Sequence, residues 1–202
     1  MWADRINRAA RRVPVWALWL TGLAPAVWFF YLGMTGGLGA EPIKALEQEL
    51  GKVALQLLVA GLAVTPLRRY LGLNVLRFRR AIGLLAFTYV CLHLAVWLFL
   101  DVQDAARIRA DIVKRPFVTV GFTALMLMIP LAATSNDLSL RRLGPRWRRL
   151  HRLVYPVAVL GAVHFIWLSK GFQFEPLIYL AVILGLLALR LSPGKVLARS
   201  VR

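Results

Sequence analysis

The chain has 202 residues, of which 59% are apolar and 17% are charged, and it carries a net charge of +17. Soluble domains average about 45–50% apolar and about 25% charged residues, so this composition indicates an integral membrane protein. The single cysteine, Cys91, excludes an intrachain disulfide and any multi-cysteine zinc or iron–sulfur site.

Six apolar runs follow one another along the chain. The first is too long for the h-region of a signal peptide, which is about 7–15 residues. The second is short and is predicted to stop at Pro66. The mixed-charge segment 101–115 is expected to form a surface helix lying on the membrane. The sequence therefore predicts an all-α integral membrane protein, with residues 1–202 forming a single six-transmembrane-helix bundle. The predicted membrane helices are 13–34, 50–65, 81–100, 116–134, 150–168 and 176–191.

Basic residues gather on one side of this predicted bundle. The N-terminal segment, the second-to-third and fourth-to-fifth helix loops, and the C-terminal tail hold 19 of the 26 lysines and arginines. Because such an excess marks the cytoplasmic side of a membrane protein, both termini are predicted to be cytoplasmic. Membrane topology accounts for the positive charge, so no nucleic-acid partner is expected.

All three histidines lie in or beside apolar runs, at His93, His151 and His164. Ionisable residues deep in a membrane are costly and mark function by default, so we interpret these histidines as cofactor ligands, with haem as the natural cofactor. His93 lies about 20 Å from the cytoplasmic start of its helix, and His164 reaches a matching depth. These two are predicted to be the axial ligands of one outer haem, whereas His151 remains at the inner level.

Arg79 lies fourteen positions before His93, at the depth of His151. Arginine stays protonated and is a poor iron ligand, so Arg79 is predicted to pair with haem propionates or a flavin phosphate. A second, inner haem would have His151 as its only certain ligand. Thirteen helical steps rotate by about 220°, which would point His151 and His164 apart on a straight helix. Pro156 lies between them, and a kink or a local unwinding of the helix is predicted to correct this phase.

Other interpretations stay open from the residues alone. A membrane histidine can simply hydrogen-bond to a neighbouring helix, and His151 can be a boundary residue facing water or headgroups. A haem-free transporter or assembly scaffold is an alternative from another class, although transporters more often contain inverted repeats and interrupted helices. A quinone-linked cytochrome b that needs no periplasmic partner is a third alternative.

Together, three segments make the chain resemble the MsrQ (YedZ) family, within the ferric reductase-like transmembrane group, over nearly its whole length. The resemblance implies a haem b protein of the bacterial inner membrane that also uses FMN, with His93, His151 and His164 as haem ligands. It also implies electron delivery to MsrP, a periplasmic molybdopterin methionine sulfoxide reductase that repairs oxidised proteins. The segments are RFRRAIGLLAFTYVCLHL at 77–94, DIVKRPFVTVG at 111–121 and LGPRWRRLHRLVY at 143–155, followed by His164.

The chain departs from the eukaryotic relatives of this group, which have four histidines, at Arg79. The resemblance therefore leaves the second ligand of an inner haem open. The C-terminal flavin and NADPH domain of those relatives is not expected in this sequence, so a cytosolic flavin reductase or the quinone pool is expected to donate electrons. The resemblance thus implies an electron-transfer subunit of an oxidoreductase system rather than a self-contained enzyme.

Overall fold

The computed structural model describes residues 2–169 and 173–191, and all regular secondary structure in these ranges is helical. Three short segments, η1 (Leu76–Phe78), η2 (Trp97–Val102) and η3 (His151–Leu153), connect longer helices. The α-helices are α1 (Trp2–Arg12), α2 (Val15–Thr35), α3 (Pro42–Leu71), α4 (Arg79–Val96), α5 (Ala105–Lys114), α6 (Pro116–Ala133), α7 (Asp137–Leu143), α8 (Pro145–Leu150), α9 (Val154–Leu168) and α10 (Phe174–Leu191).

Five stretches in the described ranges are long and apolar enough to cross a membrane, so this is a multi-pass membrane protein. They match the first five predicted membrane helices in order. The sixth predicted helix corresponds to α10, which is helical and packs against α9 and α3 but is not among the five, so the six-span count stays a prediction. The five stretches are Val15–Thr35, Pro42–Leu71, Leu76–Val102, Pro116–Ala133 and Pro145–Leu168.

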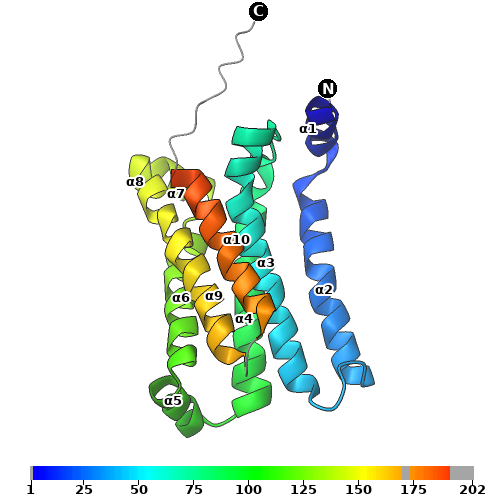
Figure 1. Cartoon of the computed structure of the whole chain (residues 1–202), viewed down its shortest axis with the longest axis vertical. Helices are drawn as coiled ribbons and strands as arrows, with labels where there is room; N and C mark the ends of the chain where they lie inside the picture. Colours follow the sequence, from blue (N-terminus) through cyan, green and yellow to red (C-terminus); the bar gives the residue numbers. More distant parts are fainter. Residues whose placement is uncertain (1, 170–172, 192–202) are drawn as a thin grey trace, which may run out of the picture.

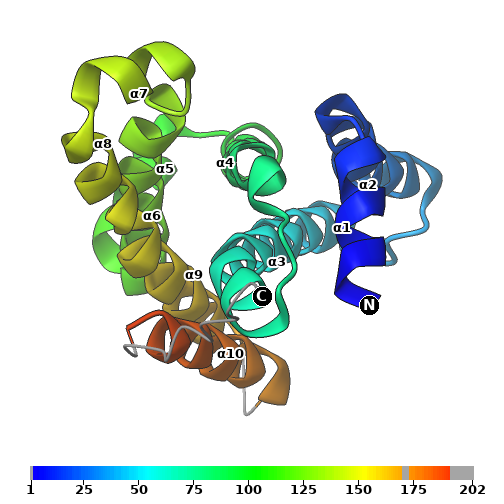
Figure 2. The same cartoon turned by 90° about the horizontal axis from the view of Figure 1, so that it is seen from above.

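The helices form a bundle in which α3 packs against α4, and α6 packs against α9 (Figures 1 and 2). Helix α10 lies beside α9 and α3, while α2 stands on the outside of α3 and α4. The short helices α1, α7 and α8 lie at one end of the bundle, at the top of Figure 1, and α5 lies at the other. The basic segments 2–12 and 137–150 therefore share one end. Lys170, Lys195, Arg199 and Arg202, which also entered the topology prediction, lie outside the described residues.

Helix α3 is longer than the sequence predicted at both ends, because it begins at Pro42 instead of residue 50 and runs through Pro66 instead of stopping there. An interior proline has no N–H and leaves the carbonyl four residues earlier without its helical donor. Here that carbonyl, Leu62 O, accepts hydrogen bonds from Arg190 of α10, at 3.0 Å from Nε and 2.7 Å from Nη2. Arg190 Nη2 also donates to Gly61 O at 3.1 Å. The predicted helix end at Pro66 was wrong because a distant arginine supplies the missing donor.

Helix α2 is joined to α4 by one tyrosine hydroxyl. Tyr89 is fully buried, and its hydroxyl donates to Gly22 O at 2.7 Å while accepting from Ala26 N at 3.1 Å. It therefore stands between the carbonyl and amide that a regular helix would pair directly. A Cβ at Gly22 would lie 2.6 Å from Leu85 Cδ1, so a larger residue where α2 meets α4 would require the Leu85 side chain to move.

The mixed-charge segment 101–115 contains α5, as a helix was predicted there. The Asp104 side chain caps its start by accepting a hydrogen bond from Ala106 N at 3.0 Å. The preceding membrane stretch ends in the π-helical turn η2, so it continues slightly past the predicted boundary at residue 100. The position of α5 on a membrane surface stays a prediction.

Candidate functional site

A cavity of 140 Å³ lies among α3, α4, α6 and α9, and the two deep histidines line it. His93 comes from α4 and His164 from α9, and their ring centres are 6.1 Å apart with the planes at 87°. The structure therefore brings these two predicted site residues together. We call this the outer cavity; its remaining walls are mostly apolar side chains.

Each of these rings is held by a backbone carbonyl on a neighbouring helix. His93 Nδ1 lies 2.9 Å from Glu47 O, and His164 Nδ1 lies 2.7 Å from Phe117 O. A carbonyl oxygen can only accept, so Nδ1 carries the proton in both rings and donates it. In the neutral imidazole the lone pair is then on Nε2, and no hydrogen bond from another described residue reaches either Nε2. Both rings thus present a free basic nitrogen beside the outer cavity.

Two glycines allow the rings to lie against these helices. Gly51 and Gly121 stand one turn after Glu47 and Phe117, respectively. A Cβ at Gly51 would lie 3.3 Å from Nδ1 of the His93 ring, and a Cβ at Gly121 would lie 3.0 Å from both Nδ1 and Cε1 of the other ring. Neither position was predicted from the sequence. The available signal was an isolated glycine inside a helical pattern, which often has a packing or functional reason.

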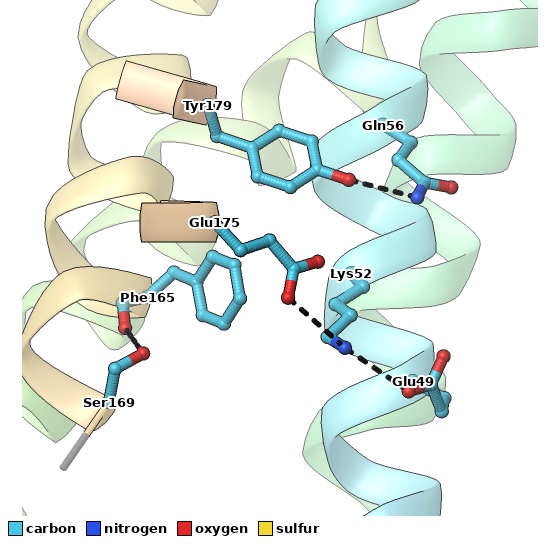
Figure 3. Close-up of polar contacts among 7 residues, drawn as sticks. All are labelled: Glu49, Lys52, Gln56, Phe165, Ser169, Glu175 and Tyr179. Carbon is cyan, nitrogen blue, oxygen red and sulfur yellow. Dashed lines mark hydrogen bonds and ion pairs between the residues drawn. The ribbon is translucent and has the colours of Figure 1, made fainter. Parts of the chain in front are cut away.

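Charged side chains from α3 and α10 stand beside the outer cavity, and they too were not predicted as site residues from the sequence. Glu47 Oε1 lies 4.0 Å from the Nε2 atom of His93. Lys52 Nζ lies 3.3 Å from Glu49 Oε1 and 3.6 Å from Glu175 Oε2, so it bridges α3 and α10 (Figure 3).

One turn further along α3, Gln56 Nε2 donates to Tyr179 Oη at 2.9 Å (Figure 3). The Tyr179 ring also packs against Phe165 of α9, with the two ring centres 6.0 Å apart. These contacts and the Lys52 bridge attach α10 to the outside of the α3–α9 wall. Helix α10 therefore holds together two of the helices that line the outer cavity, α3 and α9.

A second cavity, of 270 Å³, lies toward the end of the bundle that carries α7 and α8. Arg79, Ser135, Trp147 and His151 are among its polar lining residues, and the remainder is largely apolar. We call it the inner cavity. Three apolar side chains line both cavities and so stand at their common wall: Leu58, Met128 and Val157.

His151 is held differently from the two outer histidines. Its ring stacks on Trp147, with ring centres 3.8 Å apart and planes at 23°, and its Nε2 lies 3.1 Å from Thr134 Oγ1. The Thr134 hydroxyl donates its one proton to Pro130 O at 2.6 Å, so it accepts from the His151 Nε2–H. The free lone pair of this neutral ring is therefore on Nδ1.

The helix changes its winding between His151 and His164, where a kink or a local unwinding was predicted. His151 belongs to the 3₁₀ turn η3, and α9 begins only at Val154. Pro156 is the third residue of α9, in its first turn, where helical N–H groups have no partner within the helix. The two histidines therefore do not lie on one regular α-helix, since a 3₁₀ turn carries His151 and α9 carries His164.

Arg79 is the first residue of α4, and its guanidinium lines the inner cavity. Within residues 2–169 and 173–191 it has no hydrogen bond or ion pair, whereas the adjacent Arg80 pairs with Asp137. Its charged neighbour is Arg190, which has the same sign. The inner cavity therefore has an uncompensated positive charge at its rim, which favours an anionic group.

Comparison with known proteins gives close relatives. Residues 49–162 match the family described as ferric reductase like transmembrane component. The chain is 48% identical over 178 residues to the protein-methionine-sulfoxide reductase heme-binding subunit MsrQ of Brucella anthropi. This alignment covers 88% of this chain and 81% of that relative. Relatives of the same name from Brucella ovis and Brucella canis are 48% identical over 179 residues, with the same coverage. No solved structure was found to match the chain.

Proposed function

This chain belongs to the MsrQ family, and we propose that it is the haem-binding, electron-transferring membrane subunit of a methionine sulfoxide reductase system. The observation that carries the proposal is the His93–His164 pair. Two imidazoles face one cavity in a membrane bundle, each anchored through Nδ1 and each with Nε2 free.

The residues of the outer cavity fit a haem iron. An imidazole nitrogen lies about 2.0 Å from a bound metal, so two opposing histidine ligands have ring centres about 6 Å apart. The observed separation is 6.1 Å. A carbonyl that accepts from the second ring nitrogen is the usual support of a metal-bound histidine, because it fixes the tautomer and the ring orientation. We therefore propose that His93 and His164 are the two residues that would hold a haem b, through their Nε2 atoms.

A haem bound there supplies reversible one-electron transfer, with a potential set by its ligands, their hydrogen bonds and its burial. The protein's own residues perform the supporting tasks. The carbonyls of Glu47 and Phe117 hold the two imidazoles in one tautomer and one orientation, and the apolar side chains around them limit access of water. Residues 1–202 act in this proposal as one ferric reductase-like transmembrane domain.

The inner cavity is the proposed place of a second cofactor, either FMN or an inner haem b. Arg79 suits the phosphate of the one or the propionates of the other, because its planar guanidinium binds such oxygens in pairs. His151 offers Nδ1 as a ligand nitrogen, but no second histidine lines this cavity. The residues present therefore fit an anionic group better than they fit a second bis-histidine haem.

The proposed direction of transfer runs from the inner cavity to the outer one. The donor is a cytosolic flavin reductase or the quinone pool, and the acceptor is a periplasmic MsrP-type molybdoenzyme that reduces methionine sulfoxide. The protein then resides in the bacterial inner membrane with both termini in the cytoplasm. The common wall of Leu58, Met128 and Val157 supports this relay, because the two cavities are neighbours.

Haem quantification in histidine variants tests the proposal. His93→Ala and His164→Ala should each abolish the same low-spin haem signal, measured by EPR and by pyridine haemochrome per polypeptide. His151→Ala is the matched control and should spare that signal, while removing an inner haem if the protein binds two. A six-coordinate spectrum that survives intact in either of the first two variants would show the ligand pair to be wrong.

A further inference from the structure

The N-terminal helix α1 lies across the end of the bundle. It is seen end-on in Figure 1 and along its length in Figure 2, whereas α2 runs along the bundle in Figure 1. Only Val13 and Pro14 separate it from α2, which begins at Val15 and is long and apolar enough to span the membrane. The chain therefore keeps α1 at the level where α2 leaves the bilayer.

Two sets of hydrogen bonds fix α1 to the connection between α3 and α4. Asn7 Nδ2 donates to Gly72 O at 3.0 Å, and Asn7 Oδ1 accepts from Asn74 N at 2.8 Å. Arg77 Nη1 donates to Arg11 O at 2.6 Å, a carbonyl at the C-terminal end of α1. These bonds determine which side of α1 is docked and which sides are left open.

The remaining surface of α1 carries an apolar face and a basic face, with Asp4 and Arg11 between the basic face and the docked side. Ala3, Asn7 and Ala10 are half-buried on the docked side. At 100° per residue, Trp2, Ile6 and Ala9 fall within about 60° of one another on a second face. That face is open, with Trp2 58% and Ile6 43% exposed.

The basic face is equally compact. Arg5, Arg8 and Arg12 are exposed and fall within about 60° of one another, on the side of the apolar face away from Asn7. An exposed tryptophan and isoleucine next to three guanidinium groups is the pattern of helices that lie in a membrane interface. The positive charges complement the phosphates of anionic lipids, which attract basic segments close to a membrane.

We propose that α1 is an interfacial anchor for anionic lipid, with Trp2, Ile6 and Ala9 among the upper acyl chains and Arg5, Arg8 and Arg12 on headgroup phosphates. The Asn7 and Arg77 bonds then connect this lipid-bound helix to residues 72–77, which lead directly into Arg79 at the inner cavity. Lipid thus fixes the position of the segment that forms one rim of that cavity.

The experiment places one environment-sensitive fluorophore on α1 of the full chain in nanodiscs, using Ile6→Cys in a Cys91→Ala background. The matched control is Arg8→Cys on the basic face. Lipid-borne doxyl groups should quench the label at position 6 several-fold more strongly than the label at position 8, and aqueous iodide should show the reverse order. Equal quenching at both positions by both agents would overturn the interfacial placement.

A second experiment tests whether the basic face of α1 binds anionic lipid headgroups. Nanodiscs of phosphatidylcholine alone, and an Arg5→Gln, Arg8→Gln, Arg12→Gln variant in mixed phosphatidylglycerol nanodiscs, should both raise iodide quenching of the position-6 label. Unchanged quenching in both would overturn the role of headgroup charge. Iodide could instead quench the position-6 label freely in nanodiscs, with protection only after a cytosolic protein fraction is added. That result would show that the apolar face binds a protein partner, and it would contradict the proposal. Haem content does not enter either readout, so the result is independent of the proposed function.

Discussion

At the scale of single residues, the outer cavity depends on two glycines that are unequal in how much space they leave. Gly121 is the tighter position, since a Cβ there would lie 3.0 Å from two atoms of the His164 ring. At Gly51 the tightest ring contact would be 3.3 Å, a gap that a small movement of His93 relieves. The two positions therefore form a graded pair for testing how far the carbonyl anchors set the ligand orientation.

Gly121→Ala is expected to lower haem content and disturb the low-spin spectrum, and Gly51→Ala is expected to do so less. A helix-interior Gly→Ala change otherwise stabilises by roughly 0.5–1 kcal/mol, so a loss is attributable to the displaced imidazole. Haem per polypeptide and EPR g-values measure the effect. Gly185→Ala on α10 is the control, because a Cβ there meets nothing within 4 Å. A native spectrum in Gly121→Ala would contradict the prediction.

Arg79→Ala is expected to weaken cofactor binding at the inner cavity, or to shift the potential measured there, while leaving the outer low-spin signal unchanged. The reason is that a guanidinium without a partner in the described chain is removed from the cavity rim. Arg79→Lys keeps the charge but loses the planar fork, so it should fall between the wild type and Arg79→Ala. Redox titration followed by EPR checks both variants. Loss of the outer signal in Arg79→Ala would show that the two cavities are not separate.

The proximity of His93 and His164 could be predicted from the sequence, because their positions in two helices place both side chains at the same depth in the membrane. Their anchors could not be predicted in the same way. The carbonyls of Glu47 and Phe117 become available only through the rotation of α3 and α6 about their own axes, which depends on the whole packing. The Thr134 hydroxyl bound to His151 Nε2 depends similarly on where α6 ends.

At the scale of elements, Arg190 and Pro66 form a coupled pair across α10 and α3. Arg190→Ala leaves the carbonyl of Leu62 without a donor in an apolar environment, which costs about 1–3 kcal/mol. In a Pro66→Ala background the restored N–H can pair with Leu62 O, so the same substitution should cost less. A double-mutant cycle on unfolding free energies in detergent measures this coupling. Equal costs in the two backgrounds would show that the arginine does not replace the missing helical bond.

Arg190 and Pro66 also explain why the end of α3 could not be predicted from the sequence. Local pattern places the apolar runs correctly to within a few residues, except for α3. Pro66 is a breaker by local rules, and the residue that compensates for it is 128 positions from Leu62. The helix α1 was also missed, since its apolar face of Trp2, Ile6 and Ala9 is too short to stand out beside four arginines.

At the scale of the whole molecule, the basic segments at α1, α7 and α8 share one end of the bundle, opposite α5. We expect that end, with both termini, to face the cytoplasm, because excess lysine and arginine retain loops there. Alkaline phosphatase fused after Arg202 should be inactive, and the same enzyme fused after Gln103, next to α5, should be active. Equal activity of the two fusions would rule out the six-helix topology, and high activity of the first with low activity of the second would show that the orientation is reversed.

The outer cavity has a consequence for the persistence of the protein in a cell. One of its imidazoles is anchored within the α3–α4 pair and the other within the α6–α9 pair, so a group held by both joins the two halves of the bundle. A ligand that binds only the folded state raises the free energy of unfolding by mass action. Under the proposed function, haem supply and protein abundance become linked. Chains made during haem starvation open more often into separate helix pairs, and membrane proteases remove them first.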